Sequence, residues 1–280
     1  MVYVMVVYRG LNKAKIPSAA RGRLGMYLTK ETAYVMPTVV VTGSGRGIGR
    51  AIAVRFAREG WNVVVNAKRG REEAEETLRL VRSAGGSGVV VLADVATREG
   101  CRQVVNAAVE NFGGLDVLVN NAGLGLFSLF LNADDRLIEK QLEVSLKSVI
   151  YCSQEAAKTM GEGSIINIAS IAGIRPFVGL SIYSAAKAAI INLTQALAVE
   201  LAPRIRVNAV APGVVKTKMG DSFLKVLGMG EEEFARRYTL LGRVVSPDDV
   251  AEAVWMLVKI PTITGQVVVV DSGQLLLGRL

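Results

Sequence analysis

The stretch Thr38-Val39-Val40-Val41-Thr42-Gly43-Ser44-Gly45-Arg46-Gly47-Ile48-Gly49 places a glycine-rich loop directly after a short β-branched run. The run predicts a buried strand, and residues 48–59 follow with the apolar spacing of a helix. Glycines at such a junction let the backbone turn tightly and approach a pyrophosphate, and the helix N-terminus supplies N–H donors. The spacing is Thr-Gly-x-x-x-Gly-x-Gly rather than Gly-x-Gly-x-x-Gly. It predicts a dinucleotide site, the alternative being a glycine-rich connection that binds nothing.

Beyond this loop, strand and helix patterns alternate along the chain. The predicted strands cover residues 38–42, 61–66, 88–92, 115–120, 164–169, 204–210 and 266–270. The predicted helices cover residues 48–59, 71–83, 98–111, 134–160, 183–201 and 247–258, with a less regular stretch after Pro212-Gly213 to about residue 242. Nearly continuous apolar strands that alternate with helices are typical of a parallel sheet covered on both faces. The sequence therefore predicts an α/β fold with a single doubly wound, Rossmann-like parallel β-sheet.

Residues 1–35 form a basic N-terminal extension outside this pattern. An apolar run over residues 1–8 precedes the basic residues, which is the reverse of the signal-peptide order. The extension carries a net charge of +5, which leaves +3 of the total +8 for the other 245 residues. Three alternatives stay open for it: an extra strand or arm, a flexible tail, or sequence upstream of a true start at Met36. Residues 36–280 are predicted to form one dinucleotide-binding domain.

Composition excludes several classes of function. The chain has no histidine, which excludes Ser-His-Asp and Cys-His catalysis as well as histidine-based metal sites. Cys101 and Cys152 lie far apart in the sequence without partners, so we expect no metal site and a reducing compartment, the cytoplasm. No apolar run approaches the ~18 residues of a membrane span. Nucleic acid is not an expected partner, because most of the excess positive charge lies in residues 1–35.

The end of the second predicted strand indicates which dinucleotide the loop would hold. NAD binders usually place an acid there for the ribose 2′-hydroxyl, whereas basic residues accommodate the 2′-phosphate of NADP. This chain has Asn66-Ala67-Lys68-Arg69, and Arg46 adds a cation in the loop. Lysine and arginine pair with a phosphate that a carboxylate would repel. NADP(H) is therefore favoured over NAD(H), the alternative being that these cations are solvated surface charges.

A tyrosine and a lysine lie four residues apart in Ser181-Ile182-Tyr183-Ser184-Ala185-Ala186-Lys187-Ala188-Ala189. The alanine-rich run predicts a helix, on which positions i and i+4 share a face. Because a nearby cation favours phenolate over phenol, we expect Lys187 to lower the pKa of Tyr183 and make it a proton donor or acceptor. Taken alone, the spacing favours the alternative of a helix with one buried tyrosine and one solvated lysine.

Seven motifs in order make the chain similar to the standard branch of the short-chain dehydrogenase/reductase family, over about residues 37–273. These motifs are the Thr42–Gly49 loop, Asp94-Val95, Asn120-Asn121-Ala122-Gly123, Ser170, Tyr183-x-x-x-Lys187, Asn208 and Pro212-Gly213-x-x-x-Thr217. The resemblance implies that Ser170 holds the substrate oxygen, Tyr183 passes the proton, and Lys187 binds the nicotinamide ribose and depresses the pKa of Tyr183. The implied cofactor-binding positions are Gly43, Ser44, Gly45, Arg46, Gly47, Ile48, Gly49, Ala67, Lys68, Arg69, Asp94, Val95, Asn121, Ala122, Gly123, Tyr183, Lys187, Pro212, Gly213, Val215 and Thr217.

One position departs from the family pattern. The family usually has an asparagine on the long central helix that helps to hold a water in the proton relay, in a stretch that here reads Val144-Ser145-Leu146-Lys147. Serine can bond a water, but it is shorter and has one donor rather than two. Ser145 is therefore a candidate catalytic residue, and two alternatives stay open: its hydroxyl suffices, or the protein is an impaired relative.

The resemblance implies an NADP(H)-dependent oxidoreductase that interconverts an alcohol and a ketone or aldehyde, with Tyr183 as general acid/base. The expected specificity surface, residues 124–127, 171–180 and the segment after Thr217, is mainly apolar, which favours a 3-oxoacyl thioester or another small carbonyl. The pattern is similar to 3-oxoacyl-carrier-protein reductases and sugar dehydrogenases alike. The alternative function is a nucleotide-binding regulatory or scaffolding protein with little turnover. A homo-oligomer, dimer or tetramer, is expected from the resemblance.

Overall fold

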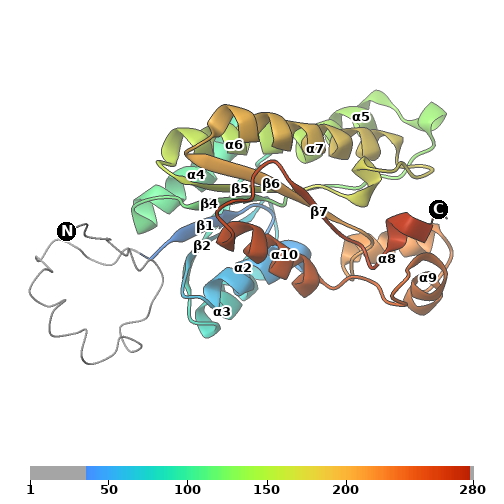
Figure 1. Cartoon of the computed structure of the whole chain (residues 1–280), viewed down its shortest axis with the longest axis horizontal. Coiled ribbons are helices and arrows are strands. Elements are labelled where there is room, and N and C mark those ends of the chain that lie inside the picture. Colours follow the sequence, from blue (N-terminus) through green and yellow to red (C-terminus); the bar gives the residue numbers. More distant parts are fainter. Residues whose placement is uncertain (1–35, 278–280) are drawn as a thin grey trace, which may run out of the picture. The chain divides into compact units, whose positions relative to one another are not determined.

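The computed structural model describes residues 36–277, and the predicted basic extension lies outside them. Seven parallel strands form one sheet in the order β3-β2-β1-β4-β5-β6-β7 (Figure 1). Their bounds are β1 Thr38–Val41, β2 Asn62–Ala67, β3 Ser87–Leu92, β4 Val117–Asn120, β5 Gly163–Ile168, β6 Ile205–Pro212 and β7 Val267–Val270. The strand order reverses between β1 and β4. Parallel sheets of this kind bind ligands outside the carboxyl ends of the strands at such a switch point.

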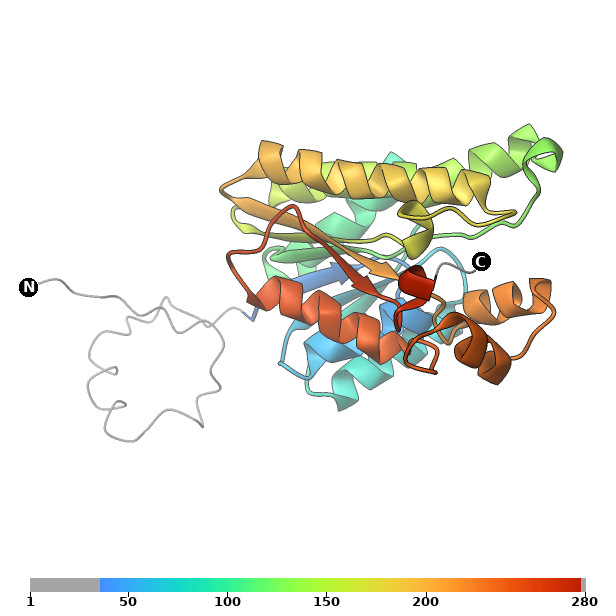
Figure 2. The same ribbon diagram turned by 45° about the vertical axis from the view of Figure 1, so that its right-hand side comes forward.

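Helices cover both faces of the sheet, which confirms the predicted doubly wound α/β fold. One face carries α2 (Gly47–Ala57), α3 (Arg71–Ser83) and α10 (Pro247–Lys259), and the other carries α4 (Arg98–Phe112), α6 (Ser148–Thr159) and α7 (Ser181–Leu201) (Figures 1 and 2). Side chains alternate across each strand. Val39 and Val41 therefore pack with Phe56 and Leu257 on the first face, whereas Val40 packs with the second.

The single helix predicted over residues 134–160 is interrupted. Its first part is α5 (Asp135–Leu142), which is followed by a π-helical turn, Glu143–Lys147, and then by α6. In the turn, the Ser148 N–H bonds the carbonyl of Glu143 instead of Val144. The Ser148 hydroxyl donates to the carbonyl of Val144 at 2.6 Å and satisfies the acceptor that the wider turn leaves free. Single π-turns of this kind occur frequently at functional sites.

The stretch predicted to be less regular after Pro212 contains two short helices, α8 (Lys218–Val226) and α9 (Glu231–Tyr238). Thr217 caps α8 by accepting a hydrogen bond from the N–H of Gly220 at 3.2 Å. Phe234 is fully buried and packs with Leu224 and Val244 in a small separate core. Neither helix was predicted, because the apolar pattern of each is too short to indicate a helix by periodicity alone. The glycines on either side also made the stretch resemble a loop.

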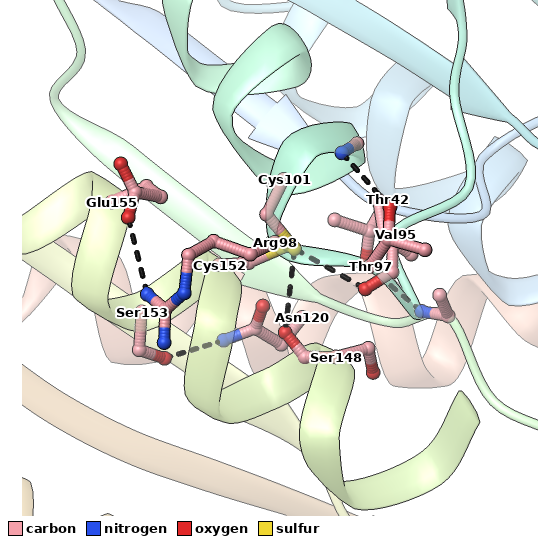
Figure 3. Close-up of a disulfide and its surroundings, with 12 residues drawn as sticks. Thr42, Val95, Thr97, Arg98, Cys101, Asn120, Ser148, Cys152, Ser153 and Glu155 are labelled. Carbon is pink, nitrogen blue, oxygen red and sulfur yellow. Dashed lines mark hydrogen bonds and ion pairs between the residues drawn. A yellow bond between two sulfur atoms is a disulfide. The ribbon is translucent and has the colours of Figure 1, made fainter. Parts of the chain in front are cut away.

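Cys101 and Cys152, expected to have no partners, form a disulfide in this structure (Figure 3). Cys101 lies on α4 and Cys152 on α6, and both side chains are buried where these helices pack on the same face. The sequence did not predict this bond because the two cysteines lie 51 residues apart and no local pattern pairs them. The crossover topology brings their helices together. Two free thiols were the basis for expecting a reducing compartment, and that basis is lost.

The helix α7 is long and apolar enough, by length and composition, to resemble a membrane span. The burial pattern of α7 shows that apolar residues on one side of it pack against the rest of the protein. Lys187, Ile190 and Thr194 are buried on one side of α7, and Ile190 packs with Ala209 and Ala211 of β6. These contacts make α7 a core helix of the sheet.

Candidate active site

The loop between β1 and α2 is held by its neighbours in a fixed shape. The N–H of Gly43 donates to Asn66 Oδ1 at 3.1 Å, and Asn121 Nδ2 donates to the carbonyls of Thr42 and Gly43 at 2.9 and 3.1 Å. Gly43 has a φ of +62°, in the left-handed region that favours glycine. A Cβ on Gly49 would lie 2.6 Å from Asn121 Nδ2. The side chains of Asn66 and Asn121 therefore shape the loop.

Ser44 ties the loop to the sheet rather than facing outward. Its side chain is fully buried, and its hydroxyl donates to the carbonyl of Val41 at 2.7 Å and accepts from the N–H of Asn66 at 3.0 Å. The next residues begin α2 at Gly47, where the first N–H groups of a helix have no intrahelical acceptor. The groups that this loop can offer a phosphate are therefore backbone N–H donors at the helix start.

Two of the three cations expected at a 2′-phosphate, Lys68 and Arg46, are paired with carboxylates. Lys68, after β2, pairs with Asp94, after β3. Burial opposes ionisation of Asp94, yet its bonds from Lys68 and from the Ala96 N–H hold the pKa of that carboxyl below its usual value. Arg46 pairs with Glu73 on α3 at 3.2 Å, and Lys218 on α8 reaches the same carboxylate at 3.1 Å. These pairs are solvent-exposed, where ion pairs contribute about 0–1 kcal/mol and exchange readily.

Glu73 and Lys218 were not predicted as site residues. Hydrogen bonding from Lys218 and Arg46 outweighs burial and lowers the pKa of the Glu73 carboxyl. The pair joins the first turn of α3 to the start of α8 across a sequence separation of 145 residues. No sequence pattern reveals such a contact, because each residue alone resembles an ordinary charge in the first turn of a helix.

Ser170, Tyr183 and Lys187 come together at the carboxyl end of β5. Ser170 follows β5 and accepts a hydrogen bond from the N–H of Ala172 at 3.1 Å. Its side chain is also near enough to Tyr183 to lower the pKa of the phenol. Lys187, four residues later on α7, is buried and donates to the carbonyl of Ile168 at 2.7 Å. The packing is close, because a Cβ on Gly173 would lie 2.6 Å from the Lys187 backbone.

The expected lowering of the Tyr183 pKa by Lys187 is wrong for this arrangement. Burial raises the pKa of the Tyr183 phenol, and the nearby Ser170 side chain offsets this only in part. Burial also lowers the pKa of the Lys187 ammonium to about 8. The Lys187 Nζ lies 5.7 Å from the centroid of the Tyr183 ring. In the protein alone the tyrosine is therefore a protonated acid at neutral pH, because burial disfavours the charged phenolate.

The segment after β6 closes the site from the other side. The N–H of Gly213 donates to the carbonyl of Val270 at 2.9 Å, so the turn after Pro212 is fixed to β7. Val215 forms an isolated bridge with Val245. A Cβ on Gly47 would lie 3.4 Å from the methyl group of Thr217. The start of α8 therefore faces the start of α2 across the predicted pyrophosphate position.

The residues after β4 connect the two halves of the site. A Cβ on Gly43 would lie 3.0 Å from the Cα of Ala122, so this strand end packs directly on the glycine-rich loop. A Cβ on Gly123 would lie 3.6 Å from Lys187 Nζ, and one on Gly125 would lie 3.9 Å from the Tyr183 ring. Val95 and Ala67 are buried, so only their backbones can contact a ligand.

Ser145 does not face an open position. Its side chain is fully buried, and its hydroxyl donates to the carbonyl of Leu124 at 3.0 Å. It accepts from the Leu124 N–H at 3.3 Å and from Gln141 Nε2 at 2.7 Å. A hydroxyl has one donor and two acceptor sites, so protein groups satisfy all three. The sequence prediction that Ser145 could hold a relay water through its hydroxyl is not supported by this arrangement.

The surroundings of Lys187 fit a nicotinamide cofactor. Among residues 36–277 its ammonium has a single hydrogen-bond acceptor, the carbonyl of Ile168, although the side chain is only 4% exposed. A buried ammonium with three donors and one partner is costly unless acceptors arrive from a ligand. Ribose hydroxyls are acceptors of the required kind. The glycine-rich loop and the N-terminus of α2 supply the matching environment for phosphates.

Comparisons with known proteins show the family to which the chain belongs. A family model described as Enoyl-(Acyl carrier protein) reductase matches residues 43–274. The 3-oxoacyl-[acyl-carrier-protein] reductase FabG of Staphylococcus aureus is 36% identical over 242 residues, covering 84% of this chain and 97% of the relative. The short-chain reductase protein NovJ of Streptomyces niveus is 37% identical over 256 residues, covering 88% and 97%.

Solved structures give the same result. A short-chain dehydrogenase/reductase from Burkholderia xenovorans superposes with a TM-score of 0.79 at 33% identity, covering 86% of this chain and 98% of the other. The fold and the site therefore define a nucleotide-dependent oxidoreductase. The chain belongs to the short-chain dehydrogenase/reductase family, which implies a nicotinamide cofactor and a small-molecule substrate.

Proposed function

We propose that the protein is an NADP(H)-dependent oxidoreductase that interconverts an alcohol and a ketone or aldehyde, with Tyr183 as general acid/base. The proposal rests on one observation: the side chains of Ser170, Tyr183 and Lys187 lie close together at the carboxyl end of β5. The cofactor would supply the hydride. Lys187, Asp94 and the loop at Gly43–Gly49 would hold it, with Asn121, Gly123, Val215 and Thr217 bordering the same space.

The side chains have distinct tasks in the direction of reduction. The Ser170 hydroxyl accepts from the Ala172 N–H, which leaves its own proton to stabilise the developing charge on a carbonyl oxygen. Burial keeps the Tyr183 phenol protonated at neutral pH, as a proton donor to that oxygen requires. Lys187 would bind ribose hydroxyls and fix the cofactor beside the phenol. Positioning of the reactants supplies much of the remaining acceleration.

The substrate that the site favours is a 3-oxoacyl thioester or another small, apolar carbonyl. Two relatives support this class by name, the reductase FabG and the granaticin polyketide synthase ketoacyl reductase 2 of Streptomyces violaceoruber, which is 39% identical. Exposed apolar side chains also lie near the site, including Phe127, Ile174 and Met219. Such side chains would contact an acyl chain more favourably than a sugar.

A panel assay tests the proposal. The full chain is incubated with NADPH or NADH and with ketones, aldehydes, 3-oxoacyl thioesters and, for the reverse reaction, alcohols and sugars. We expect NADPH oxidation with carbonyls and highest activity with thioesters. Absence of turnover with every compound, together with retained NADPH binding, would favour the regulatory alternative that Ser145 left open.

Replacing both arginines, Arg46→Ala/Arg69→Ala, should selectively weaken NADPH. Arg46 has its partner Glu73 at the surface, and Arg69 is exposed directly after β2. Each charge-assisted hydrogen bond to a phosphate contributes about 1.5–3 kcal/mol, so we expect the Kd for NADPH to rise at least about 100-fold when both are lost. The Kd for NADH should change less than threefold, on the order of 0.5 kcal/mol. Equal losses for both nucleotides, measured by fluorescence titration, would refute a 2′-phosphate site here.

A homo-oligomer, dimer or tetramer, is part of the proposal. Val199 on α7 is 82% exposed, and Val269 on the edge strand β7 is also exposed. Both belong to surfaces through which family members commonly associate. Sedimentation equilibrium of the full chain distinguishes a monomer, a dimer and a tetramer directly.

A further inference from the structure

Gln141 is a polar residue in an unexpected environment. It lies near the end of α5, one turn before Ser145, and its side chain is fully buried. Burying a carboxamide without hydrogen bonds would cost several kcal/mol. Its presence therefore calls for partners of matching geometry, and the structure provides them in the segment that follows β4.

The carboxamide of Gln141 bonds both ends of the short segment Leu124–Leu126. Its Oε1 accepts from the N–H of Leu126 at 2.9 Å. Its Nε2 donates to the carbonyl of Leu124 and to the hydroxyl of Ser145, the latter at 2.7 Å. Exchanging the carboxamide oxygen and nitrogen would set an NH₂ group against the Leu126 N–H, so the network fixes the orientation. One side chain thus satisfies two backbone groups on either side of Gly125.

The held segment lies against the reacting side chains. It begins directly after Gly123, whose added Cβ would lie 3.6 Å from Lys187 Nζ, and it contains Gly125, whose added Cβ would lie 3.9 Å from the Tyr183 ring. A Cβ on Gly125 would also lie 3.5 Å from the sulfur of Met219 at the start of α8. The position of this segment therefore sets the space left between the cofactor side and the substrate side of Tyr183.

We propose that Gln141 is a positioning residue that, together with Ser145, clamps the segment Leu124–Leu126 beside Tyr183 and Lys187. The two side chains form one unit, because Gln141 Nε2 bonds Ser145 Oγ and both donate to the carbonyl of Leu124. The π-helical turn at Glu143–Lys147 contains Ser145, so the clamp lies where the helix is widened. This inference rests on the proposed oxidoreductase function for its kinetic consequences, but its structural consequence is independent of it.

The test uses the full chain with NADPH and the best carbonyl from the panel. Gln141→Leu keeps the approximate volume and removes all three hydrogen bonds. A displacement of about 1 Å near reacting atoms can cost about 100-fold in rate, so we expect kcat to fall about 100-fold. The Kd for NADPH should change less than threefold, because none of the three bonds reaches a cofactor-binding group.

Two variants separate positioning from general destabilisation. Thr194→Val on α7 is the matched control: Thr194 is also fully buried and accepts a hydrogen bond from Asn167 Nδ2 at 3.0 Å, away from the segment. It should lower the melting temperature yet leave kcat within about twofold of wild type, a change of about 0.4 kcal/mol in the barrier. Gln141→Glu should rescue activity at low pH, where a neutral carboxyl can still donate, and lose it as pH rises and the carboxylate forms.

Hydrogen exchange of the peptide that contains residues 124–126 gives a readout without turnover. Gln141→Leu and Ser145→Ala should each speed this exchange, and the double variant should be no faster than the worse single one, as expected for one unit. If exchange and kcat in Gln141→Leu match those of Thr194→Val, the clamp is refuted. If wild type has no turnover with any substrate but exchange responds as stated, the function fails and the clamp stands.

Discussion

Tyr183→Phe should lose nearly all turnover and keep its affinity for NADPH. In the proposed mechanism the Tyr183 phenol, which burial keeps protonated, donates the proton to a carbonyl oxygen held by Ser170. General acid catalysis contributes about 10²–10⁴-fold, so kcat should fall by about 10³-fold. The change removes one hydroxyl and no ring, so packing is retained.

The measurement is single-turnover reduction of the best panel substrate, with NADPH affinity from fluorescence quenching. Tyr151→Phe on α6 is the matched control, because Tyr151 packs under Arg98 with the guanidinium 4.6 Å from its ring centroid and lies outside the site. Its kcat should be that of wild type. Retention of more than about a tenth of wild-type kcat by Tyr183→Phe, about 1.4 kcal/mol or less in the barrier, would show that another group donates the proton.

The fold was predictable because its signals are local and repeated. Runs such as Val39–Val41 and Val63–Val65 are apolar without alternation, which only a sheet covered on both faces accommodates. The glycine loop before α2 and the Tyr183–Lys187 spacing likewise need only short stretches of sequence. From these features the doubly wound parallel sheet, the glycine-rich loop and the Tyr183–Lys187 pair could be predicted, whereas Ser170 followed from the family resemblance.

The features that could not be predicted from the sequence depend on contacts between distant segments or on how deeply a side chain is buried. The disulfide between Cys101 and Cys152 follows from two crossover helices packing on one face. Gln141 reads as an ordinary helix residue until the segment after β4 folds onto it. The direction of the Tyr183 pKa shift could not be predicted for a related reason. The helical spacing shows that a cation is near, but burial, which the spacing does not show, determines whether the pKa rises or falls.

Lys187→Met should abolish efficient turnover and yet stabilise the cofactor-free protein at neutral pH. In the proposed function the ammonium is the donor for the cofactor ribose, so its loss should lower kcat/KM at least about 100-fold, or about 2.7 kcal/mol. The stability effect follows from the pKa of Lys187, which burial lowers from 10.5 to about 8. At pH 7 the lysine is charged in both states, so the folded state bears the full cost, about 3 kcal/mol.

The destabilisation caused by the buried charge of Lys187 should depend on pH in a definite direction. Between pH 8 and 10.5 the unfolded chain binds more protons at this lysine than the folded protein does, so wild-type stability should rise with pH relative to the variant. Methionine leaves the Ile168 carbonyl without this donor, which costs about 1–3 kcal/mol. The variant should therefore be more stable by about 1 kcal/mol at pH 7 and should lose this advantage by pH 10.

Urea unfolding of wild type, Lys187→Met and the surface control Lys158→Met at pH 7, 8, 9 and 10 measures this difference. Lys158 pairs with Glu155 at 2.9 Å at the surface, so its replacement should change the stability only slightly. A Lys187→Met advantage that stays constant from pH 7 to pH 10 would contradict burial as the cause of the lowered pKa. An advantage that shrinks with pH would identify Lys187 as a residue whose buried charge reduces stability, as expected of a functional residue.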